Sequence, residues 1–431
     1  MDSIWLQTAE LPAFAPQAGD MRTDVLIIGG GMAGILCAHM LDQAGVDYVL
    51  VEADRICSGI TKDTTAKITV QHGLLYDKLI RRFGLERAQL YYRAQTVALA
   101  QYRTLCRTID CNFTEADSYV YALSDRGKIE REAEALERIG CHAAVVERLP
   151  LPLTVAGAVR IEGQAQFHPL KFVCALAKNL RIFEQTKVLE LRPDGAVTQH
   201  GKIAAKMIIV ATHFPFLNKH GAYFLKLYQH RSYVLGLEQA ADVKGMYVDE
   251  SGKGLSFRNF DNLLLLGGGG HRTGKQGGGW RELEAFARRN YPDAREVCRW
   301  ATQDCMSLDS VPYIGQYARS TPNLYVATGF NKWGMTSSMV AAMLLRDLIL
   351  GKTPAYAPVF SPSRSIFHPQ LAVNAAQAIV GLLTPTAPRC PHMGCALKYN
   401  REEHTWDCAC HGSRFAEDGS LIDNPATGDR K

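Results

Sequence analysis

The chain has 431 residues, of which 47% are hydrophobic and 21% are charged. This composition is that of a globular protein of two or three domains and excludes a disordered, collagen-like or coiled-coil chain. The formal net charge is only +5, and no run of Lys and Arg exceeds two residues. Binding to nucleic acid or to a charged membrane surface favours clustered basic residues, so neither partner is expected.

The apolar stretches of the sequence indicate neither a signal peptide nor a transmembrane helix. Glu10 and Pro12 interrupt the place where the core of a signal peptide would lie. The apolar stretch 371–383 contains Asn374 and Gln377, and it is shorter than the roughly 20 residues that a spanning helix needs. The sequence therefore predicts a cytoplasmic protein without a transmembrane segment.

The N-terminal quarter predicts a βαβ unit followed by helices. Residues 24–28 form an apolar run that is typical of a buried parallel strand, and a glycine-rich turn follows it. Residues 32–44 are expected to form a helix, which ends at Gly45, and residues 47–51 a second strand. Residues 74–106 are expected to be mostly helical, with a break near Gly84.

The middle of the chain is rich in short strand-like runs. Residues 263–266 are expected to form a strand that enters a tight turn of four glycines, and residues 334–350 a long helix that ends at Gly351. Prolines then mark a linker, which is followed by a short helix and a second hinge at 384–388. The other expected strands are 118–123, 158–161, 187–191, 206–211, 232–238 and 323–328.

Three glycines in the first turn indicate a dinucleotide. Gly29, Gly31 and Gly34 fit GxGxxG between a strand and a helix, and Glu52 closes the next strand. The first glycine permits the tight turn, the second lets the backbone approach a pyrophosphate, and the third lets the helix pack on the strand. The helix N-terminus attracts phosphate, and Glu52 can accept hydrogen bonds from a ribose. The motif alone does not separate FAD from NAD.

The C-terminal tail indicates metal or redox chemistry. Four of the twelve cysteines fall in the last 42 residues of the chain, and His392 and His411 lie beside them. They form two Cys-x-His-like halves, which suit two thiolates on one iron and two imidazoles on the other. A zinc site formed by the four cysteines is the alternative. The six residues are Cys390, His392, Cys395, Cys408, Cys410 and His411.

Several other residues are weighed without a decisive motif. Cys57 could attach a cofactor covalently, although a plain buried thiol is the simpler interpretation. No pattern identifies a catalytic residue, so this role is left unassigned. Polar residues that could meet an acidic substrate, or could simply be paired within the protein, are Tyr228, Arg231, Tyr233, Arg258, His271 and Arg272.

Residues 20–355 resemble the D-amino-acid-oxidase-like FAD-dependent oxidoreductases. The resemblance rests on the segments 25–34, 59–67, 210–212 and 329–336 and on Glu52. It implies a Rossmann-like α/β FAD-binding domain of the glutathione-reductase type, interleaved with an α+β substrate domain. It also implies that Gly29, Gly31 and Gly34 hold the pyrophosphate and Glu52 the adenosine ribose. The other FAD-binding residues that it implies are Thr64, Thr65, Val188, Gly334, Met335 and Thr336.

The tail resembles a shortened Rieske [2Fe–2S] domain that is β-rich and follows the flavoprotein body. The resemblance implies Cys390, His392, Cys408 and His411 as iron ligands and a disulfide between Cys395 and Cys410. It further implies that Ser413 donates a hydrogen bond to a cluster sulfur and that residues 424–426 form a proline loop over the cluster. Phe415 stands where high-potential Rieske proteins have tyrosine, so an intermediate potential is expected.

These resemblances divide the chain into three parts. The body is expected at 1–355, the linker and helix at 356–388, and the Rieske domain at 389–431. Within the body, the FAD-binding parts are expected at about 20–105, 155–215 and 305–355, and the substrate domain at about 106–154 and 216–304.

The combination implies an FAD-dependent oxidoreductase with a Rieske centre. A small amine or amino acid would be dehydrogenated, and electrons would pass from flavin to the cluster and on to an unknown acceptor. An electron carrier or redox sensor without metabolite turnover is the alternative, and it predicts a flavin pocket closed to small molecules. An oxidase whose tail is only a zinc-binding clasp is a third possibility.

Overall fold

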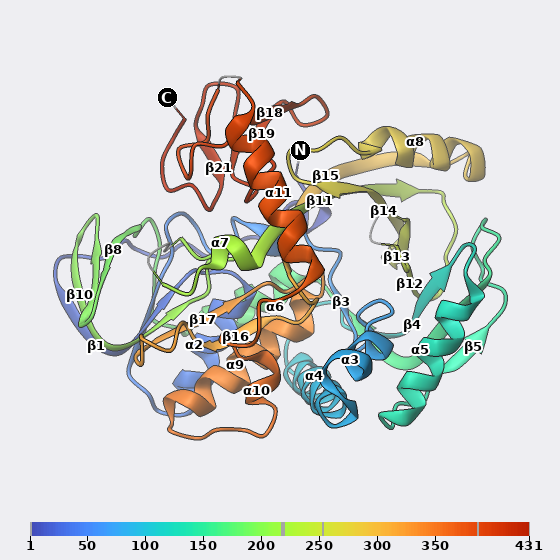
Figure 1. The fold of residues 1–431 in the computed structure, drawn as a ribbon. Coiled ribbons are helices and arrows are strands. Elements are labelled where there is room, and N and C mark those ends of the chain that lie inside the picture. Colours follow the sequence, from blue (N-terminus) through green and yellow to red (C-terminus); the bar gives the residue numbers. More distant parts are fainter. Residues whose placement is uncertain (1, 217–219, 252–253, 386–387, 431) are drawn as a thin grey trace.

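The computed structural model describes residues 2–216, 220–251, 254–385 and 388–430. Two large sheets lie side by side, and a third, small sheet lies above them (Figure 1). The first large sheet contains β1 and β10, on the left of Figure 1, and the second contains β4, β11 and β14, on the right. The mixed architecture agrees with the fold class expected from the sequence.

The first large sheet begins with the predicted βαβ unit. Strands β1 (Met21–Ile28) and β2 (Tyr48–Val51) are parallel neighbours, and α2 (Met32–Gln43) connects them. β2 is fully buried because helices and chain cover both faces of a parallel sheet. The remaining strands of this sheet are β7 (Ile182–Phe183), β8 (Val188–Arg192), β9 (Gly195–Thr198), β10 (Gly201–Val210), β16 (Tyr313–Gln316) and β17 (Leu324–Thr328).

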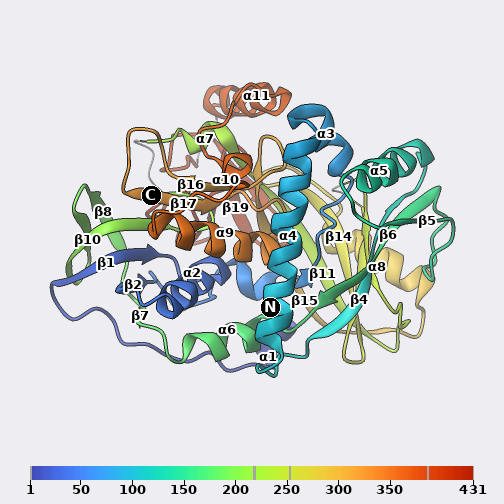
Figure 2. The same cartoon turned by 90° about the horizontal axis from the view of Figure 1, so that it is seen from below.

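Helices pack on this sheet and in the space between the two large sheets (Figure 2). The predicted helical region with a break at Gly84 is confirmed, since α3 (Tyr76–Phe83) and α4 (Leu85–Cys106) meet at this glycine. Helix α9 (Gly334–Ile349) packs against both α2 and α4. The shorter helices of this part are α1 (Ile4–Gln7), η1 (Ile60–Asp63), α6 (Pro169–Ala177) and α10 (Ala357–Phe360).

The second large sheet is mainly antiparallel. Helix α8 (Gly279–Asn290) packs on β14 and β11, and α5 (Arg126–Arg138) packs near β4 and β6. Strand β6 lies in this sheet although its residues fall in a segment expected to bind FAD. In sheet order the strands are β15 (Arg295–Ser307), β11 (Leu227–Glu238), β14 (Leu263–Arg272), β13 (Ser256–Phe260), β12 (Met246–Asp249), β4 (Thr114–Ala122), β6 (Gly157–Gln166) and β3 (Lys67–Ile68), with β5 (Ala144–Val146) beside β6.

The expectation of a tight turn at the four glycines after residue 266 is wrong. Strand β14 continues through them to Arg272 and pairs with β11 and β13. A Cβ at Gly267 would lie 2.5 Å from Ser256 Oγ, and one at Gly269 would lie 2.2 Å from the carbonyl oxygen of Gly279. The glycines therefore serve close packing within a strand rather than a turn.

The third sheet is formed by the C-terminal tail. Its antiparallel strands follow one another in space as they do in sequence. Helices α7 (Tyr223–Lys226) and α11 (Pro369–Leu383) pack against each other beside it. The second predicted hinge, at 384–388, includes residues 386–387, which lie outside the described residues. The strands are β18 (Leu397–Asn400), β19 (Thr405–Cys408), β20 (Arg414–Phe415) and β21 (Leu421–Asp423).

Within the part of the chain that the structure describes, no helix has the length and apolar character needed to cross a membrane.

Candidate functional site

The glycine turn leaves no space for side chains at two of its three glycines. A Cβ at Gly34 would lie 1.8 Å from the carbonyl oxygen of Gly29, and one at Gly29 would lie 2.6 Å from that of Ala211. Gly29 also has a φ of 111°, which side chains disfavour. The first turn of α2 therefore approaches β1 and β10 as closely as the motif requires.

Glu52 is held by the backbone at the end of β2. Its Oε2 accepts a hydrogen bond from the Gly30 N–H at 2.6 Å, and its Oε1 accepts one from the Asp54 N–H at 3.0 Å. Burial raises the pKa of Glu52 above its ordinary value, while these N–H groups act in the opposite direction. A carboxylate has about four acceptor positions, so Glu52 can still accept from a ribose hydroxyl.

Thr61 caps the N-terminus of α2, a role that no sequence motif indicated. Its Oγ1 accepts the N–H of Met32 at 3.0 Å and is 3.3 Å from where a Cβ on Gly31 would lie. Threonine is a preferred N-cap residue, but here the cap comes from a segment about 30 residues away. Only the position of Thr61 inside the segment 59–67 could have indicated it.

A cavity of about 1590 Å³ brings most of the expected FAD-binding residues together. Gly34 does not line it because this glycine serves the contact between helix and strand. Thr336 does not line it either, because its hydroxyl donates to the Thr69 carbonyl at 3.1 Å and lies 3.0 Å from His72 Nε2. The expected residues that line the cavity are Gly29, Gly31, Glu52, Thr64, Thr65, Val188, Gly334 and Met335.

Ionisable groups to which the sequence assigned no role also line this cavity. Burial raises the pKa of Asp63 to about 7, and Lys62 lies 3.7 Å from its carboxylate. Burial also lowers the pKa of Lys67 to about 7. Asp304 and Lys332 attract each other, but burial still raises the pKa of the carboxyl and lowers that of the amine. Asp304 and Lys332 are neighbours only in the folded chain.

The tail contributes to the wall of the same cavity. Its hairpin between β18 and β19 faces the strands β11 and β15 of the body. One cavity thus reaches from the glycine turn to the tail. The lining residues from the tail are Arg401, Glu402, Glu403, His404, Thr405, Arg414, Leu421, Ile422, Asp423, Asn424, Ala426 and Thr427.

Two loops of the tail, which we name the outer loop (390–395) and the inner loop (408–413), fold alike. In each, the N–H of a glycine donates to the carbonyl of the first cysteine, from Gly394 to Cys390 and from Gly412 to Cys408, both at 2.9 Å. Both glycines have positive φ, 75° and 90°. The N–H of the first cysteine in turn donates to the carbonyl of the last residue of the loop, Cys395 or Ser413, again at 2.9 Å. The loops therefore present equivalent cysteines.

The expected iron ligands converge where the two loops meet. Cys390 and Cys408 are buried, and an S–H donated by Cys408 lowers the pKa of Cys390 to about 7. The rings of His392 and His411 are 5.0 Å apart and nearly perpendicular. Burial lowers the pKa of His411 to about 3, so its ring is neutral, and its buried Nδ1 has no hydrogen-bond partner among the described residues. A neutral imidazole and a deprotonatable thiol are what a metal requires.

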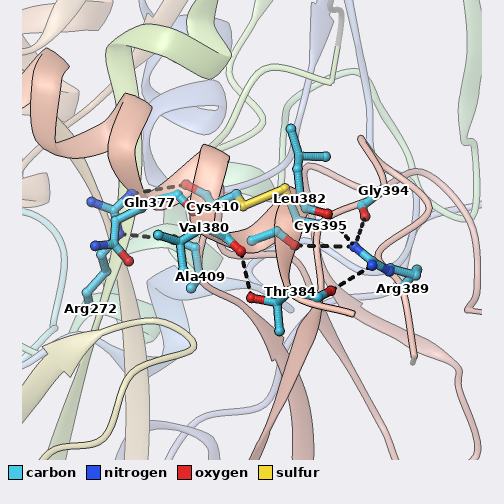
Figure 3. Close-up of a disulfide and its surroundings, with 11 residues drawn as sticks. Arg272, Gln377, Val380, Leu382, Thr384, Arg389, Gly394, Cys395, Ala409 and Cys410 are labelled. Carbon is cyan, nitrogen blue, oxygen red and sulfur yellow. Dashed lines mark hydrogen bonds between the residues drawn. A yellow bond between two sulfur atoms is a disulfide. The ribbon is translucent and has the colours of Figure 1, made fainter. Parts of the chain in front are cut away.

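Cys395 and Cys410 form a disulfide that joins the outer loop to the inner loop (Figure 3). The Sγ atoms of Cys395, Cys408 and Cys410 lie within 4.8 Å of one another. A zinc site of four thiolates would need the two sulfurs that the disulfide uses, so the zinc alternative loses its ligands. Helix α11 covers the disulfide, since a Cβ on Gly381 would lie 2.7 Å from Cys410 Sγ.

The body holds the inner loop through two polar side chains. Arg272 donates to the carbonyl oxygens of Ala409 at 3.0 Å and Cys410 at 3.1 Å, and Gln303 donates to that of Gly412 at 3.0 Å. Glycines bring the surfaces together, because a Cβ on Gly412 would lie 2.1 Å from Gln229 and one on Gly274 would lie 2.5 Å from the Ala409 nitrogen. The inner loop is thus seated directly on β11, β14 and β15.

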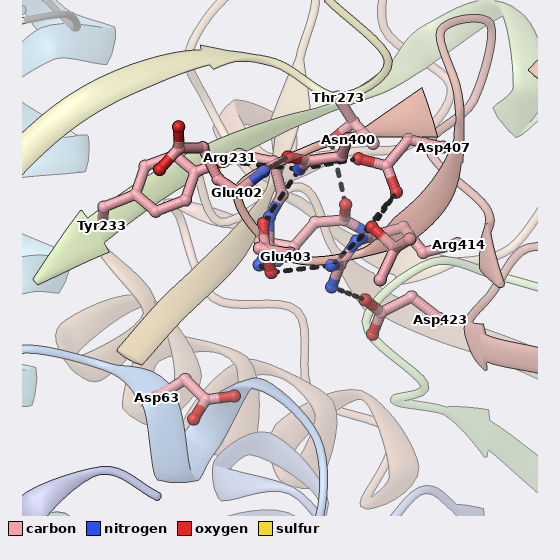
Figure 4. Close-up of polar contacts among 12 residues, drawn as sticks. Asp63, Arg231, Tyr233, Thr273, Asn400, Glu402, Glu403, Asp407, Arg414 and Asp423 are labelled. Carbon is pink, nitrogen blue, oxygen red and sulfur yellow. Dashed lines mark hydrogen bonds and ion pairs between the residues drawn. The ribbon is translucent and has the colours of Figure 1, made fainter. Parts of the chain in front are cut away.

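A buried network of charges joins the hairpin of the tail to β11 (Figure 4). Glu403 bridges Arg231 of the body and Arg414 of the tail, and Arg414 also pairs with Asp407 and Asp423. Burial by itself would raise the pKa of Glu403, but the two guanidinium groups outweigh it and hold the pKa below its usual value. The side chains of Arg231 and Glu403 are only 3% and 10% exposed, so the pair is shielded from water.

The other weighed residues are paired within the protein. Arg258 donates to the carbonyls of Thr65 and Ala66, and Tyr233 bonds to His271 at 2.9 Å. Tyr228 lies under the guanidinium of Arg272 at 4.9 Å. The Cys57 thiol is buried and lines the cavity. These residues support the architecture of the site.

Comparison with known proteins identifies the larger part of the chain. The family model for FAD dependent oxidoreductases (DAO) matches residues 24–348. The chain belongs to the DAO family. A Rieske [2Fe-2S] domain matches residues 364–430 of this DAO-family protein. The expected flavoprotein body with a C-terminal Rieske domain is therefore confirmed, as are FAD and the [2Fe–2S] cluster as cofactors.

Relatives of this DAO-family protein include one with the same extent. The Rieske 2Fe-2S iron-sulfur protein YhfW of Bacillus subtilis is 34% identical, over 99% of this chain and 96% of that protein. Gamma-glutamylputrescine oxidoreductase of Escherichia coli is 24% identical, over 82% of this chain and 91% of that protein. The crystal structure of glycine oxidase from Geobacillus kaustophilus matches with a TM-score of 0.67 and 22% identity, over 80% of this chain and 99% of that one. The last shows a shared fold.

The residues of the two sites fit both cofactors. The close contact at Gly34 and the backbone-held Glu52 suit an adenine dinucleotide. The paired thiols, the neutral His411 ring and its unpartnered Nδ1 suit an iron–sulfur cluster bound by two cysteines and two histidines.

Proposed function

We propose that this protein dehydrogenates a small amine or amino acid at FAD and passes the electrons through the Rieske cluster to a separate acceptor. The observation that carries the proposal is the single cavity lined at one end by the glycine turn and at the other by the Rieske hairpin. An enzyme that oxidises a metabolite at one cofactor and delivers electrons through another benefits from this proximity. The relatives named for gamma-glutamylputrescine and glycine support the substrate class.

The chain would hold each cofactor with the residues described above. Gly29, Gly31 and Glu52 would bind the dinucleotide, and the N-terminus of α9 would stabilise negative charge at Gly334 and Met335. Cys390, His392, Cys408 and His411 would bind the iron. When bound, FAD supplies two-electron oxidation of a C–H bond beside nitrogen, and the cluster supplies one-electron transfer.

Asp63 is suited to take the proton that an amine substrate carries. Amines enter as ammonium ions, and only the neutral form has the lone pair that assists loss of hydride. The Asp63 carboxyl lines the cavity, and its pKa of about 7 makes it an effective proton acceptor near neutral pH. Its negative charge also attracts a cation, while the neighbouring Lys67, also with a pKa of about 7, can be neutral.

The size of the cavity argues against an electron carrier or sensor without turnover. Such a protein would enclose its flavin and exclude small molecules. The cavity of about 1590 Å³ exceeds the roughly 300–1,000 Å³ of an ordinary ligand pocket. The volume supports space for a substrate beside the dinucleotide.

The test is anaerobic reduction of the protein loaded with both cofactors by a panel of amines, amino acids and hydroxy acids. Bleaching of the flavin absorbance, followed by a Rieske-type EPR signal, is the expected result with at least one amine or amino acid. Iron and zinc are counted in the same preparation. Reduction of neither cofactor by any member of the panel would overturn the proposal, and flavin reduction without cluster reduction would overturn the electron path.

A further inference from the structure

Helix α11 is built with its polar side inward and its apolar side outward. Its polar side chains are Gln370, Asn374 and Gln377, of which Asn374 is buried and the other two are half-buried. Asn374 Oδ1 accepts hydrogen bonds from Arg272 of the body at 2.8 Å and from Gln370 at 3.1 Å. The exposed residues are without exception apolar: Pro369, Ala372, Val373, Ala375, Ala376, Ile379, Val380, Leu382 and Leu383. A surface helix of a monomer has the opposite arrangement.

The outward face is large and uncharged. Residues 365–388 contain no Asp, Glu, Lys or Arg. Phe367, just before the helix, is 88% exposed, and Leu383, at its end, is 75% exposed; Met393 in the outer loop is 43% exposed. With the other exposed side chains they leave on the order of 500 Å² of apolar surface open, the upper range for the largest patch on a monomer. Figure 2 shows α11 at the edge of the molecule, with its outer side away from the body.

The outermost side chains form a stripe that is complementary to itself. Ala372, Ala376, Ile379 and Leu383 follow one another at spacings of four, three and four residues, which places them on one line along the helix. The first two are small and the last two are large. When two such helices lie antiparallel about a twofold axis, Ala372 faces Leu383 and Ala376 faces Ile379, so each large side chain meets a small one.

We propose that the outward face of α11 binds a second copy of this chain, in an antiparallel helix pair about a twofold axis. Isologous contact needs a self-complementary surface, and this stripe provides one. A helix that lies on anionic lipid is typically rich in Lys and Arg, and a transient redox partner is typically steered by charge, but residues 365–388 offer neither. Apolar, uncharged contact is typical of permanent homodimers.

The dimer does not depend on the redox chemistry proposed above, and its position has a structural consequence. Gly381 touches the disulfide, and the Arg389 guanidinium donates to the carbonyls of Leu382 and Gly394. The helix that pairs with the second copy is therefore also the cover of the outer loop (Figure 3). Pairing would fix this cover in place.

Sedimentation velocity of the full chain loaded with both cofactors tests the proposal. At micromolar concentration the wild type is expected at twice the monomer mass. The double variant Ile379→Glu/Leu383→Glu buries two charges per copy at the contact and is expected to weaken dimerisation on the order of 100-fold. Leu123→Glu, at a site that is also exposed (53%) but lies far along the chain from α11, is the control and should remain dimeric.

Two further readouts keep the result decisive. Flavin and cluster absorbance should be unchanged in all variants, since the altered side chains point outward. With diamide as oxidant, the double variant Ala372→Cys/Leu383→Cys should form an intermolecular disulfide between copies, while Ala372→Cys alone should not. A monomeric wild type overturns the proposal, whether or not it binds vesicles of phosphatidylglycerol and phosphatidylcholine, and so does a dimer that the glutamates leave intact.

Discussion

The inner and outer loops of the Rieske domain have the same backbone turn and opposite surroundings. The inner loop lies on the sheet of the body, where Arg272 and Gln303 occupy its carbonyls. The hydrogen bonds described above for the outer loop join it to residues of the tail itself, such as Arg389. Its Met393 is 43% exposed. His411 of the inner loop is buried, whereas His392 of the outer loop is half-buried.

The difference shows what local sequence and long-range packing each decide. Cysteine, glycine and their spacing specify a turn that binds metal, and they do so twice. The body then gives the two turns different roles, one at the contact with the flavoprotein and one toward the outside. This arrangement suits electrons that enter at the inner loop and leave at the outer loop.

The largest effect is expected when either loop loses its cysteine ligand. Cys390→Ser and Cys408→Ser should each remove nearly all cluster iron while FAD stays bound, because a cluster needs both thiolates. The loss of iron should be the same for both loops, although the inner loop lies on the body and the outer loop does not. Iron analysis and flavin absorbance give the measurement, and Cys106→Ser, which alters a cysteine outside both loops, should keep full iron. Substantial iron in Cys408→Ser would contradict the ligand assignment.

A smaller effect is expected at the charge network that joins hairpin and body. Arg231→Gln leaves the buried carboxylate of Glu403 with one cationic partner fewer. The free energy of unfolding should fall by about 3 kcal/mol. Arg281→Gln is the matched control, since Arg281 pairs with the neighbouring Glu402 at 2.8 Å but is 76% exposed, and should cost less than about 1 kcal/mol. The midpoint of thermal loss of cluster absorbance measures both. Equal shifts would show that burial of the pair contributes nothing.

The same pair gives the docking a pH dependence. The pKa of Glu403 is lower in the folded protein than in the unfolded chain, where it is near 4.5. The stabilisation is therefore fully present above that unfolded value and is lost as the pH falls through the folded one. Thermal midpoints should fall in acid for the wild type, and they should fall less for Arg231→Gln.

A rate effect of about 100-fold is expected from Asp63→Asn. In the wild type, kcat/KM for an amine should rise as the pH increases through about 7, because ionised Asp63 accepts the substrate proton. In Asp63→Asn, kcat/KM should no longer rise through pH 7 and should be lower than in the wild type above that pH. Asp63→Glu, which keeps the carboxyl group, should retain the rise. Superimposable pH profiles for wild type and Asp63→Asn would exclude Asp63 as the proton acceptor.

The smallest effects concern the reduction potential of the cluster. Ser413 accepts the Ala426 N–H at 3.0 Å and donates toward Cys390, so Ser413→Ala should lower the potential. Phe415→Tyr should raise it if the added hydroxyl reaches a sulfur. EPR-monitored titration with redox mediators measures both changes. A potential that rises in Ser413→Ala would contradict the hydrogen-bond argument.

Local patterns predicted those parts of the fold that depend on neighbours in sequence. The βαβ unit followed from an apolar run, a glycine turn and Glu52, and the break at Gly84 from one glycine. The four glycines after residue 266 predicted a turn, but their role is to admit α8 and Ser256, which come from other parts of the chain. Glycine thus ends a helix at Gly84 and permits close packing within β14, and only the packing of the folded chain distinguishes the two roles.

In the candidate site, motifs marked the groups that bind cofactors but not those around them. Thr61, Asp63 and Lys67 all lie in the segment 59–67, yet their roles depend on the helix and sheets that surround them. Arg231 was weighed as a substrate contact, and its partner Glu403 lies 172 residues away. Pairing over such a distance leaves no periodic signal in the sequence.

The glycine contacts between the inner loop and the body restrict which Rieske domains could replace this one. Gly412 packs on Gln229, and Gly274 packs on Ala409, so neither side of the junction tolerates a larger residue without a shift. A Rieske domain taken from an unrelated gene would need glycine at the first position and a body with glycine at the second. Lineages that carry the fusion are therefore expected to inherit both halves as a unit rather than to reassemble them by recombination.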